Sequence, residues 1–498
     1  MASDLHLSGT ILTRLELIVE RTLHKRSFYE FYRTAFAQLH IGSEYDENWH
    51  AKYLCDVLQK EAERIQRKEK RIKDIIINVP FRSSKSMLTT VIFPVWCWAV
   101  IDPGMKFISV SYSGDLALEH SRRSRDLINT VWFQRLYGNK VVLKADVAAA
   151  GHYETLTGGM RKAVGTGGQI TGSGCDIIIV DDPQNPKKAA SEIERANTIE
   201  FYDHTLYSRL NDPEVGVRII VQQRLHEQDL TGHLMDPKHG RPEDHQHICI
   251  PGELDLEVLR PIELAKYYVD GLFWRTRFNA QLLATYKKAL GSLQYAGQIG
   301  QRPVPPEGNI WKRKWFPIIE ASAIERDNNV SPIHFFIDTA YTEDEMERND
   351  PCGFLAGFIK DDRFYIVDFT ETWLDFPSLI KFTQQYVRLH GYSFGSMIYV
   401  EPKASGKSVV QMLKQPGVGL NIIEIDAEYI KDDKVTRASG VSPVIEAGRC
   451  CLISGPWNDK YLGQVTSFPK AVHDEAVDVT VYGLNVLGVS DSFFAAFI

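Results

Sequence analysis

The residues of this sequence that could do chemistry fall into two sets, one in each half of the chain. The first set is a segment that ends in Lys85-Ser86, followed about a hundred residues later by the paired acids Asp181-Asp182. A lysine can contact the terminal phosphates of a nucleotide, and a hydroxyl with a carboxylate can hold its magnesium ion. Converging carboxylates can instead hold two divalent cations that cleave a phosphodiester. The second set has the acids for that reaction: Asp338, Glu401, Asp474 and Asp478.

A phosphate-binding loop needs a strand before it and a helix after it, so that backbone N–H groups face the phosphates. The segment Asn78–Ser86 (NVPFRSSKS) follows the apolar run Ile75–Val79 and precedes a helical pattern. Val79 and Ser84 stand where such loops usually have glycine, which adopts a tight backbone most readily. The position of the lysine between strand and helix predicts a phosphate loop despite this departure.

Asp181-Asp182 end the apolar run Ile177–Val180, which places both acids at the carboxyl edge of a predicted strand. There the first acid can hold magnesium through water and the second can orient the attacking water. The alternative is a simple turn, because Asp-Asp-Pro is a good turn starter. We favour the catalytic interpretation because the lysine loop precedes these acids at a fitting distance.

The acids of the second half follow a recognisable order of predicted elements. Asp338 ends the run Ile333–Ile337, and Glu401 ends Ile398–Val400. Asp474 and Asp478 are four residues apart, so a helix would present both on one face. Each acid alone would be an ordinary strand-end or surface residue. The order of strand, hairpin, strand, helix and acidic helix is what an RNase H-like nuclease needs, with the third ligand open between Asp474 and Asp478.

Alternation of short apolar runs with helical patterns predicts a mostly parallel sheet with helices on both faces. The strand runs of the first half are Ile75–Val79, Phe107–Tyr112, Ile177–Val180 and Val217–Gln222, and the helical patterns include Asp115–Ile128 and Ala190–Tyr207. A second β-rich region begins at Ile333, where Gly353–Ile359 and Phe364–Phe369 predict a hairpin. The last predicted helix is Glu475–Leu487.

A chain of 498 residues should hold two or three domains. We expect a nucleotide-binding domain with an N-terminal helical segment in residues 1–237, a helical lid or linker in 238–312, a nuclease domain in 313–488 and a tail in 489–498. The net charge of -7 means that any DNA must be bound through local basic patches. The longest apolar stretch, Val91–Ile101, is too short for a membrane span, and the seven cysteines show no zinc motif.

Several short motifs occur in one order along the chain. In the first half they are Trp49-His50, Arg82-Ser83-Ser84-Lys85-Ser86, Ser111-Tyr112-Ser113, Leu116-Ala117, Thr171-Gly172, Asp181-Asp182-Pro183, Gln223–Leu230 (QRLHEQDL) and Gln298–Pro303 (QIGQRP). In the second half they are Asn349-Asp350, Lys434 with Arg437, and Phe468-Pro469. In this order the chain resembles the large terminase subunit of tailed bacteriophages over nearly its whole length.

The resemblance implies an α/β protein with an N-terminal P-loop (ASCE-type) ATPase of mostly parallel sheet and a C-terminal RNase H-like nuclease domain. It implies ATP with Mg²⁺ in the first domain and two Mg²⁺ or Mn²⁺ ions in the second. The implied nucleotide-binding residues are Arg82, Ser83, Ser84, Lys85, Ser86 and Asp181, with Ser86 and Asp181 on the metal and Asp182 as the catalytic carboxylate. The implied nuclease residues, both catalytic and metal-binding, are Asp338, Glu401, Asp474 and Asp478.

Further residues follow from the same resemblance. Gln223, Arg224 and His226 match the coupling motif, which senses the nucleotide state. An arginine finger from a neighbouring subunit would stabilise developing charge, and its candidates are Arg122, Arg123, Arg125 and Arg161. Phosphate contacts in the nuclease could come from Lys403, Lys407, Lys434 and Arg437.

The resemblance implies a DNA-packaging motor that moves double-stranded DNA into a procapsid and cuts concatemeric DNA. Its implied partners are the small terminase subunit, the portal protein and further copies in a pentameric ring. Its implied place is the cytoplasm of the bacterial host and not the mature virion. One alternative is an RNase H-like resolvase or recombinase whose N-terminal half has lost ATPase activity, which the missing loop glycines motivate. Another is a structural portal- or capsid-docking protein with degenerate sites.

Overall fold

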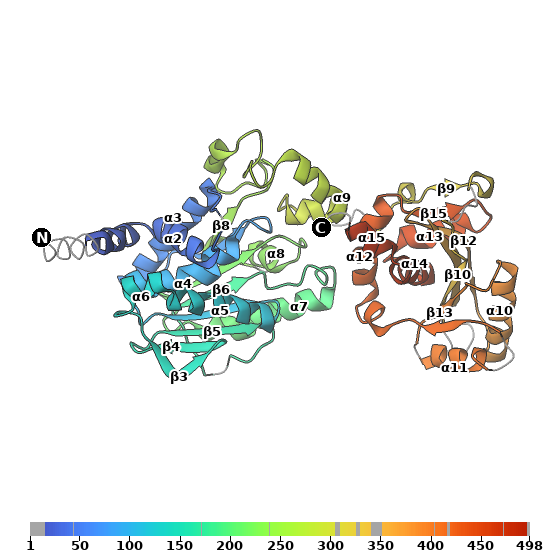
Figure 1. The fold of residues 1–498 in the computed structure, drawn as a ribbon, viewed down its shortest axis with the longest axis horizontal. Coiled ribbons are helices and arrows are strands. Elements are labelled where there is room, and N and C mark those ends of the chain that lie inside the picture. The colour runs from blue at the N-terminus through green and yellow to red at the C-terminus, as the bar shows by residue number, and fades with distance from the viewer. Residues whose placement is uncertain are drawn as a thin grey trace, which may run out of the picture. The chain divides into compact units, whose positions relative to one another are not determined.

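The computed structural model describes residues 15–42, 44–170, 172–238, 240–303, 309–324, 329–339, 351–402, 404–415, 419–471 and 473–495. The chain divides into two units, residues 1–280 with 296–304 and residues 281–295 with 305–498. Each unit is built on a sheet of its own (Figure 1). Within the described residues, no helix has both the length and the apolar character that crossing a membrane requires.

The sheet of the first unit has the strand order β3-β4-β5-β2-β6-β7-β1-β8. From β5 to β8 all neighbours are parallel, whereas β3 and β4 are joined antiparallel at one edge. The carboxyl ends of β1, β6 and β7 therefore meet at one edge of the sheet. The strand bounds are β1 Asp74–Asn78, β2 Lys106–Ser111, β3 Leu143–Ala149, β4 His152–Thr155, β5 Met160–Gly165, β6 Ile177–Asp181, β7 Val217–Gln222 and β8 His245–Cys249.

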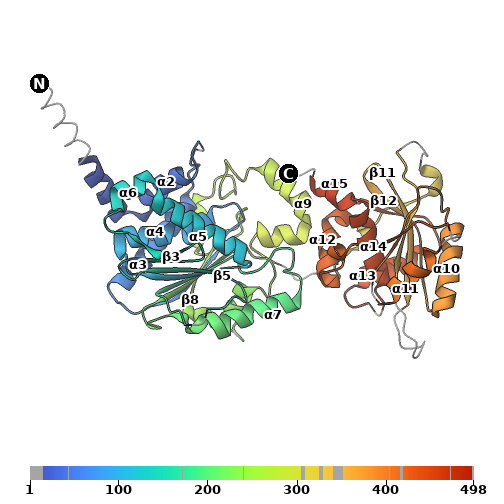
Figure 2. The same cartoon turned by 60° about the horizontal axis from the view of Figure 1, so that its bottom comes forward.

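Helices cover both faces of this sheet, which explains why β1, β6 and β7 are buried along their whole length. All residues of β6 are buried, as expected for a parallel strand between two helical layers. Figure 2 shows α4 and α5 over one face and α7 on the other. The helices of the first unit are α2 Phe28–Leu39, α3 Trp49–Gln66, η1 Met87–Ile92, α4 Phe93–Trp96, η2 Cys97–Ile101, α5 Gly114–Asn129, α6 Val131–Tyr137, α7 Glu192–Glu200, η3 Phe201–Leu206, η4 Tyr207–Arg209, α8 Leu230–Met235, η5 Pro242–Asp244 and η6 Ile262–Tyr267.

The predicted strands and helices of the first half are present, but the sheet is larger than predicted. β8 pairs with β1, with Ile248 opposite Ile77, so the sheet extends beyond residue 237, where the sequence places the end of the first domain. The run HQHIC of β8 has little apolar character, and its pairing with β1 decides its structure. The predicted helix Ala190–Tyr207 is divided, because α7 ends at Glu200 and the chain continues as the π-helix η3.

The sheet of the second unit has the strand order β14-β13-β10-β11-β12-β15-β9. The pairs β10–β11 and β11–β12 are antiparallel, and the other neighbours are parallel. The predicted hairpin is β11–β12, and Asp361 and Asp362 turn it with φ of 47° and 56°. The strand bounds are β9 Ile318–Ile319, β10 His334–Asp338, β11 Cys352–Lys360, β12 Arg363–Thr372, β13 Ile398–Val400, β14 Ile422–Glu424 and β15 Cys450–Ile453.

Two apolar cores lie on the two faces of this second sheet. Phe335 and Ile337 of β10 pack with α10 and α11, whereas Phe336 packs on the opposite face with α12, α13 and α14. The helix bounds are η7 Arg313–Trp315, η8 Ala321–Ala323, α10 Phe376–Leu389, α11 Ala404–Leu413, η9 Ala427–Tyr429, α12 Lys434–Glu446, α13 Asn458–Ser467, α14 Glu475–Val486 and α15 Val489–Ala495. A further helix, α9 (Ala280–Gln298), is interrupted at Gly291, where φ is 69°.

Candidate active sites

The loop between β1 and η1 brings Lys85 to the paired acids at the end of β6. The Lys85 Nζ lies 2.8 Å from the Oδ2 atom of Asp182, and the lysine side chain is only 5% exposed. The loop reaches this geometry without glycine, because Arg82 and Ser84 adopt the left-handed backbone, with φ of 56° and 62°. A buried lysine at the carboxyl edge of a parallel sheet is suited to holding the phosphates of a nucleotide.

Asp181 is the fully buried acid of this pair and is held by two hydroxyls. Ser86 Oγ donates to its Oδ1 at 3.0 Å, and Thr90 Oγ1 donates to its Oδ2 at 2.7 Å. Burial raises the pKa of Asp181; His120, whose Nδ1 lies 3.5 Å from Oδ2, opposes that shift. A hydroxyl beside a carboxylate supplies the hard oxygen ligands that Mg²⁺ prefers, so Ser86 and Asp181 fit the metal that the resemblance implies.

His50, which precedes the loop in the sequence, holds the loop backbone in place. Its Nε2 lies 2.9 Å from the carbonyl oxygen of Ser83, and its Nδ1 lies 2.7 Å from the Asn48 amide nitrogen. Burial lowers the pKa of His50 to about 4, so the ring is neutral near pH 7. The carbonyl of Ser83 can only accept, so Nε2 carries the ring proton and Nδ1 accepts from Asn48. The sequence motif Trp49-His50 is therefore part of the phosphate loop's support.

The predicted coupling residues follow β7, beside the catalytic acids. The backbone N–H of Gln223 donates to Asp182 Oδ1 at 3.1 Å. Arg224 Nε donates to both carboxylate oxygens of Asp229, at 3.0 and 2.9 Å. His226 Nδ1 accepts from the N–H of Gln228 at 3.1 Å, which stabilises the local turn. Of the three predicted coupling residues, Gln223 is thus the one shown to contact the acid, and Arg224 anchors the segment through Asp229.

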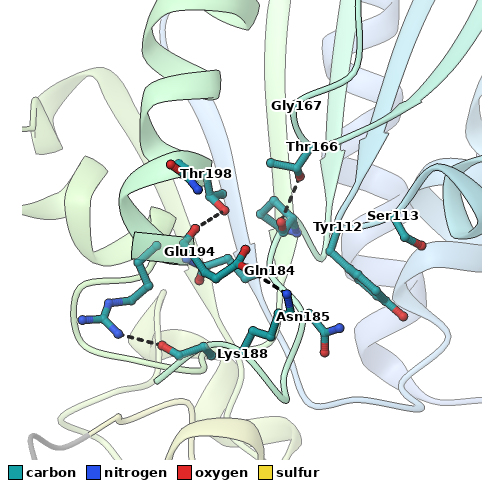
Figure 3. A pocket seen from close by; sticks show the side chains of 13 residues that line it. Tyr112, Ser113, Thr166, Gly167, Gln184, Asn185, Lys188, Glu194 and Thr198 are labelled. Carbon is teal, nitrogen blue, oxygen red and sulfur yellow. Dashed lines mark hydrogen bonds and ion pairs between the residues drawn. The ribbon is translucent and has the colours of Figure 1, made fainter. Parts of the chain in front are cut away.

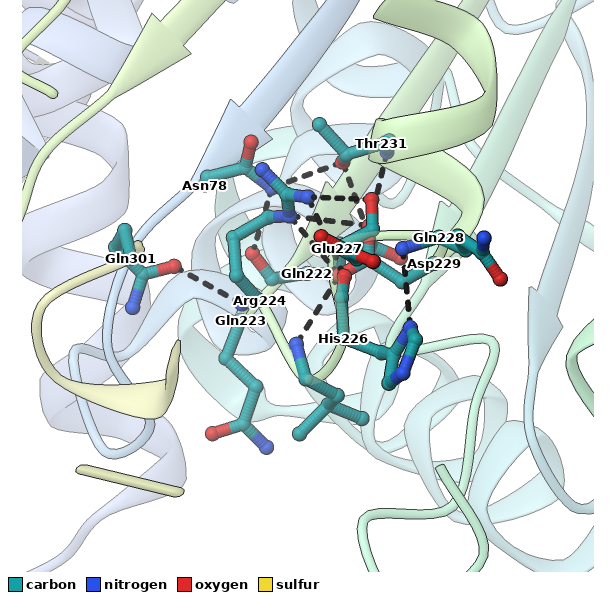
Figure 4. A network of polar contacts seen from close by, with 12 residues as sticks. Asn78, Gln222, Gln223, Arg224, His226, Glu227, Gln228, Asp229, Thr231 and Gln301 are labelled. Carbon is teal, nitrogen blue, oxygen red and sulfur yellow. Dashed lines mark hydrogen bonds and ion pairs between the residues drawn. The ribbon is translucent and has the colours of Figure 1, made fainter. Parts of the chain in front are cut away.

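Figure 4 shows this network reaching a segment that is distant in sequence. The backbone N–H of Arg224 donates to Gln301 Oε1 at 3.0 Å, and Gln301 Nε2 donates to the carbonyl of Gln298 at 2.6 Å. Thr231 Oγ1 also accepts from Asn78 of β1 and from Gln222 of β7. The ends of β1 and β7 and the segment 298–303 are therefore joined by one set of hydrogen bonds.

In the second unit, Asp338 and Glu401 lie at the ends of neighbouring parallel strands. Ile337 of β10 is paired with Val400 of β13, and the N–H of Glu401 donates to the carbonyl of Ile337 at 3.1 Å. Both acids are buried. The apolar runs that end in these acids explain the placement, since parallel strands present their carboxyl ends at the same edge.

α14 adds Asp478, which has no exposed surface and is paired with two cations. Lys434 Nζ lies 2.6 Å from its Oδ2, and Arg437 Nη2 lies 2.8 Å from its Oδ1. Lys434 also pairs with Asp474, whose side chain is 34% exposed. Lys434 and Arg437, predicted as phosphate contacts, are therefore engaged with the acids of the site.

Tyr482, one helical turn after Asp478, is influenced by the charges of all three buried acids. Burial raises the pKa of Tyr482, and the negative charges of Asp478, Asp338 and Glu401 raise it further. Its hydroxyl accepts from Arg437 Nη1 at 2.8 Å. The end of β10 and the end of β13 place Asp338 and Glu401 at one sheet edge, and Arg437 links Asp478 of α14 to Tyr482. Asp478 joins this group, and the candidate third ligand Asp474 lies at its more exposed side.

The buried acids have the donor type that Mg²⁺ and Mn²⁺ bind, and their burial also fits such an ion. Across the described residues, no group of three or more His, Cys, Asp and Glu side chains is arranged closely enough to hold a metal ion. Lys434 and Arg437 supply the positive charge at Asp478 in this arrangement. The carboxylate oxygens of these acids therefore suit a divalent cation. In this structure, Lys434 lies beside one of the acids, Asp478.

Some predicted residues lie elsewhere. Arg161 is completely buried in β5 and donates to the carbonyl of Thr90 at 2.6 Å, so it is inaccessible to a neighbouring subunit and is wrong as an arginine-finger candidate. Arg82, Arg122, Arg123 and Lys407 are exposed. The predicted motif residues Thr171, Asn349, Asp350 and Lys403 lie outside the described residues. Thr90 was missed, although its spacing from Ser86 places both hydroxyls on one helical face.

The second unit also matches a known family of domains. Residues 337–487 match the family model described as the terminase RNaseH-like domain. Over these residues the chain is similar to the terminase RNaseH-like domain. The sequence-based prediction of an RNase H-like fold is thereby confirmed, and so is the resemblance to terminases in this region. The match begins one residue before Asp338 and contains Glu401, Asp474 and Asp478, so all four predicted nuclease acids lie within the matched residues.

Solved structures resemble the chain at low sequence identity. The large terminase of a thermophilic bacteriophage is 10% identical, with a TM-score of 0.48 over 86% of this chain and 98% of that one. The large terminase of bacteriophage HK97 is 11% identical, with a TM-score of 0.34 over 92% of this chain and 100% of that one. No curated protein matches the chain. These TM-scores are below 0.5, so the solved structures carry no argument here. The likeness to terminases rests on the family match over residues 337–487.

Proposed function

We propose that the chain is the large subunit of a viral DNA-packaging motor. ATP hydrolysis in the first unit would drive double-stranded DNA into a procapsid, and the terminase RNaseH-like domain would cut concatemeric DNA. The observation that carries the proposal is the 2.8 Å contact between the buried Lys85 and Asp182 at the edge of a parallel sheet, in one chain with a region that matches the terminase RNaseH-like domain.

In the first unit, Lys85 would bind the terminal phosphates of ATP, and Ser86 with Asp181 would hold Mg²⁺. The ion, when bound, supplies positive charge to the phosphates. Asp182 would orient the attacking water, since its Oδ1 is already fixed by the N–H of Gln223. Arg82 would reach the phosphates from the exposed side of the loop. Ser83 and Ser84 would contribute backbone N–H groups, as phosphate loops do.

In the second unit, Asp338, Glu401 and Asp478 would hold two divalent cations, Mg²⁺ or Mn²⁺. Such ions activate water and stabilise the leaving oxygen of a phosphodiester. Arg437 would hold Asp478 in position, because it bonds both this carboxylate and Tyr482. Asp474 would keep Lys434 close to the scissile phosphate.

The proposed function brings proposed partners and a proposed place in infection. The partners are double-stranded DNA, the small terminase subunit, the portal protein and other copies of the chain in a pentameric ring on the procapsid. Because the net charge of the protein is -7, DNA would be bound by local basic patches and not by overall charge. The protein would work in the cytoplasm of the bacterial host and be absent from the mature virion.

The ATPase half of the proposal is tested by ATP turnover of the full chain with and without double-stranded DNA. Lys85→Ala should lower turnover by about 10²-fold or more, because it removes the cation beside the phosphates. Lys70→Ala is a matched control, since Lys70 is an exposed lysine paired with Glu214. No turnover by the wild type, even with DNA and partner subunits, would contradict the motor.

The nuclease half is tested separately by plasmid cutting in Mg²⁺ or Mn²⁺. Asp338→Asn should abolish cutting without affecting ATP turnover, because the two sites have separate residues. Cutting that survives this substitution would show that the acids of β10, β13 and α14 are not the nuclease site.

A further inference from the structure

A polar pocket lies at the carboxyl edge of the first sheet, beside the phosphate loop but built from different residues. It has a volume of about 440 Å³, which is within the usual range for small-molecule sites. Figure 3 shows Tyr112 and Ser113 on one side and Glu194 and Thr198 of α7 on the other. Its lining includes Tyr112, Thr166, Gln184, Lys188, Glu194 and Arg195.

Gln184 is the residue of this pocket whose chemistry the fold does not use. It is 6% exposed, and within the described part of the chain neither its Oε1 nor its Nε2 has a hydrogen-bond partner. A buried amide without partners costs stability, so such groups are rare unless they meet a ligand. Gln184 offers one donor and one acceptor side by side to a molecule in the pocket.

The cations of the pocket are already satisfied, which argues for an uncharged ligand group. Lys188 Nζ pairs with Glu194 Oε1 at 2.9 Å. Arg195 Nη1 donates to the carbonyls of Ala189 and Ala190, at 2.8 and 2.7 Å. A neutral polar ligand group needs neither of these two cations, because both already have partners within the fold.

The pocket walls are fixed before any ligand enters. Thr166 Oγ1 donates to the carbonyl of Pro183 at 3.0 Å, which ties the loop after β5 to the loop after β6. The N–H of Tyr112 donates to the carbonyl of Asp182 at 3.0 Å. Tyr112 itself is 37% exposed, so its ring can receive a flat partner. Preformed walls reduce the ordering cost of binding.

We propose that this pocket binds a nucleobase, adenine above all, by stacking on Tyr112 and pairing with the Gln184 amide. A glutamine amide pairs with adenine through two hydrogen bonds, and bases stack on aromatic side chains. The choice of a nucleobase rests on the proposed function, since ATP and DNA are the molecules that such a motor handles. The base of a free nucleotide and the base of a DNA strand present the same edge to the amide.

The experiment is ligand-observed saturation-transfer NMR with the full chain and 2′-deoxyadenosine, which has no phosphate for Lys85. Saturation should reach the base protons H2 and H8 in the wild type and equally in Lys85→Ala. Gln184→Leu and, separately, Tyr112→Ala should each weaken binding by about 10-fold. Gln169→Leu, an exposed glutamine that does not line the pocket, should bind as the wild type does.

Two outcomes would overturn the proposal: no nucleoside binding, or binding that needs Lys85 and ignores Gln184. The melting temperature gives a second check, because Gln184→Leu should melt at or above the wild-type temperature if the amide is idle in the fold. A clear fall would show a structural role and overturn the proposal as well. 2′-Deoxyadenosine 5′-monophosphate and a short single-stranded adenine oligonucleotide, compared with the same variants, then separate the two sources of the base. If ATP turnover continues while nucleoside binding fails, this proposal is wrong but the proposed motor function is not contradicted.

Discussion

The ammonium of Lys434 lies 2.6 Å from a carboxylate oxygen of Asp478, and this acid has no exposed surface. Burial by itself lowers the pKa of Lys434, but Asp478 and Asp474 more than offset that effect, so the pKa is raised. Burial raises the pKa of Asp478, and Lys434 and Arg437 oppose the shift. The lysine is therefore held in its charged form beside the buried acid of the proposed nuclease site.

Lys434→Ala should destabilise the chain by about 3 kcal/mol, because it removes one of two cations from a buried carboxylate. Added Mn²⁺ should recover part of this loss and should stabilise the variant more than the wild type. Thermal unfolding with and without Mn²⁺ measures both effects. The control Lys431→Ala removes an exposed lysine 3.8 Å from Glu428 and should change stability by less than about 1 kcal/mol. Equal effects of Mn²⁺ on variant and wild type would contradict the prediction.

The two candidate third ligands can be separated by matched substitutions. Asp478→Asn should lower plasmid cutting by about 10²-fold or more, because Asp478 is the fully buried acid of α14 and is held by Lys434 and Arg437. Asp474→Asn should have a smaller effect, of about 10-fold, because this acid is partly exposed and positions Lys434. Circular dichroism and thermal unfolding check that each variant folds. The reverse ranking would assign the metal to Asp474.

The stability of the first unit should fall as the pH falls from about 6.5 to about 4, because of its buried histidines. Burial lowers the pKa of His50 from 6.5 to about 4, so over this range the unfolded chain binds a proton that the folded chain does not. The contribution of the neutral His50 to the free energy of unfolding is fully present above pH 6.5 and is lost towards pH 4. It amounts to about 3 kcal/mol. Burial lowers the pKa of His24 and His247 to about 4 as well.

Chemical denaturation at several pH values measures this dependence. His50→Gln should make the unfolding free energy fall less steeply between pH 6.5 and 4, because glutamine can still donate to Ser83 but does not titrate. Parallel curves for variant and wild type would show that His50 is not responsible. The other buried histidines should leave part of the slope in the variant.

Gln301→Leu should lower DNA translocation while leaving basal ATP hydrolysis almost unchanged. It removes the acceptor of the Arg224 N–H but leaves Lys85, Asp181 and Asp182 in place. We expect basal ATP turnover close to that of the wild type and DNA translocation, measured by packaging or triplex displacement, lower by about 3- to 30-fold. Arg302→Ala alters the same segment at an exposed ion pair with Asp255 and Glu257, and should preserve translocation. Loss of both activities in Gln301→Leu would indicate misfolding or a direct role in hydrolysis.

Strand ends were the part of this protein that could be predicted from its sequence. Apolar runs such as Ile177–Val180 and Ile398–Val400 end in acids, and strand pairing brings these acids to shared edges. β8 and the antiparallel edge strands could not be predicted in this way, because pairing with neighbours decides their structure more than their own composition does. β8 in particular has the mixed run HQHIC.

Contacts between side chains of different helices and strands could not be predicted from the sequence either. The charges of Lys434 and Arg437 suggested phosphate contacts, but the packing of α12 beside α14 directs both side chains to Asp478. His50 supports Ser83 from a helix that lies more than thirty residues earlier. No spacing rule links such positions, since tertiary packing alone brings them together.

The loop that carries Lys85 holds its left-handed turns with Arg82 and Ser84. What the turn requires is a dihedral angle, which glycine meets at the lowest cost but which other residues can also adopt. A motif search that requires glycine in this loop would miss this chain and any other chain that forms the turn with other residues. A search that scores a buried strand, a short turn and a Lys-Ser pair, followed by a second strand ending in two acids, would retrieve them.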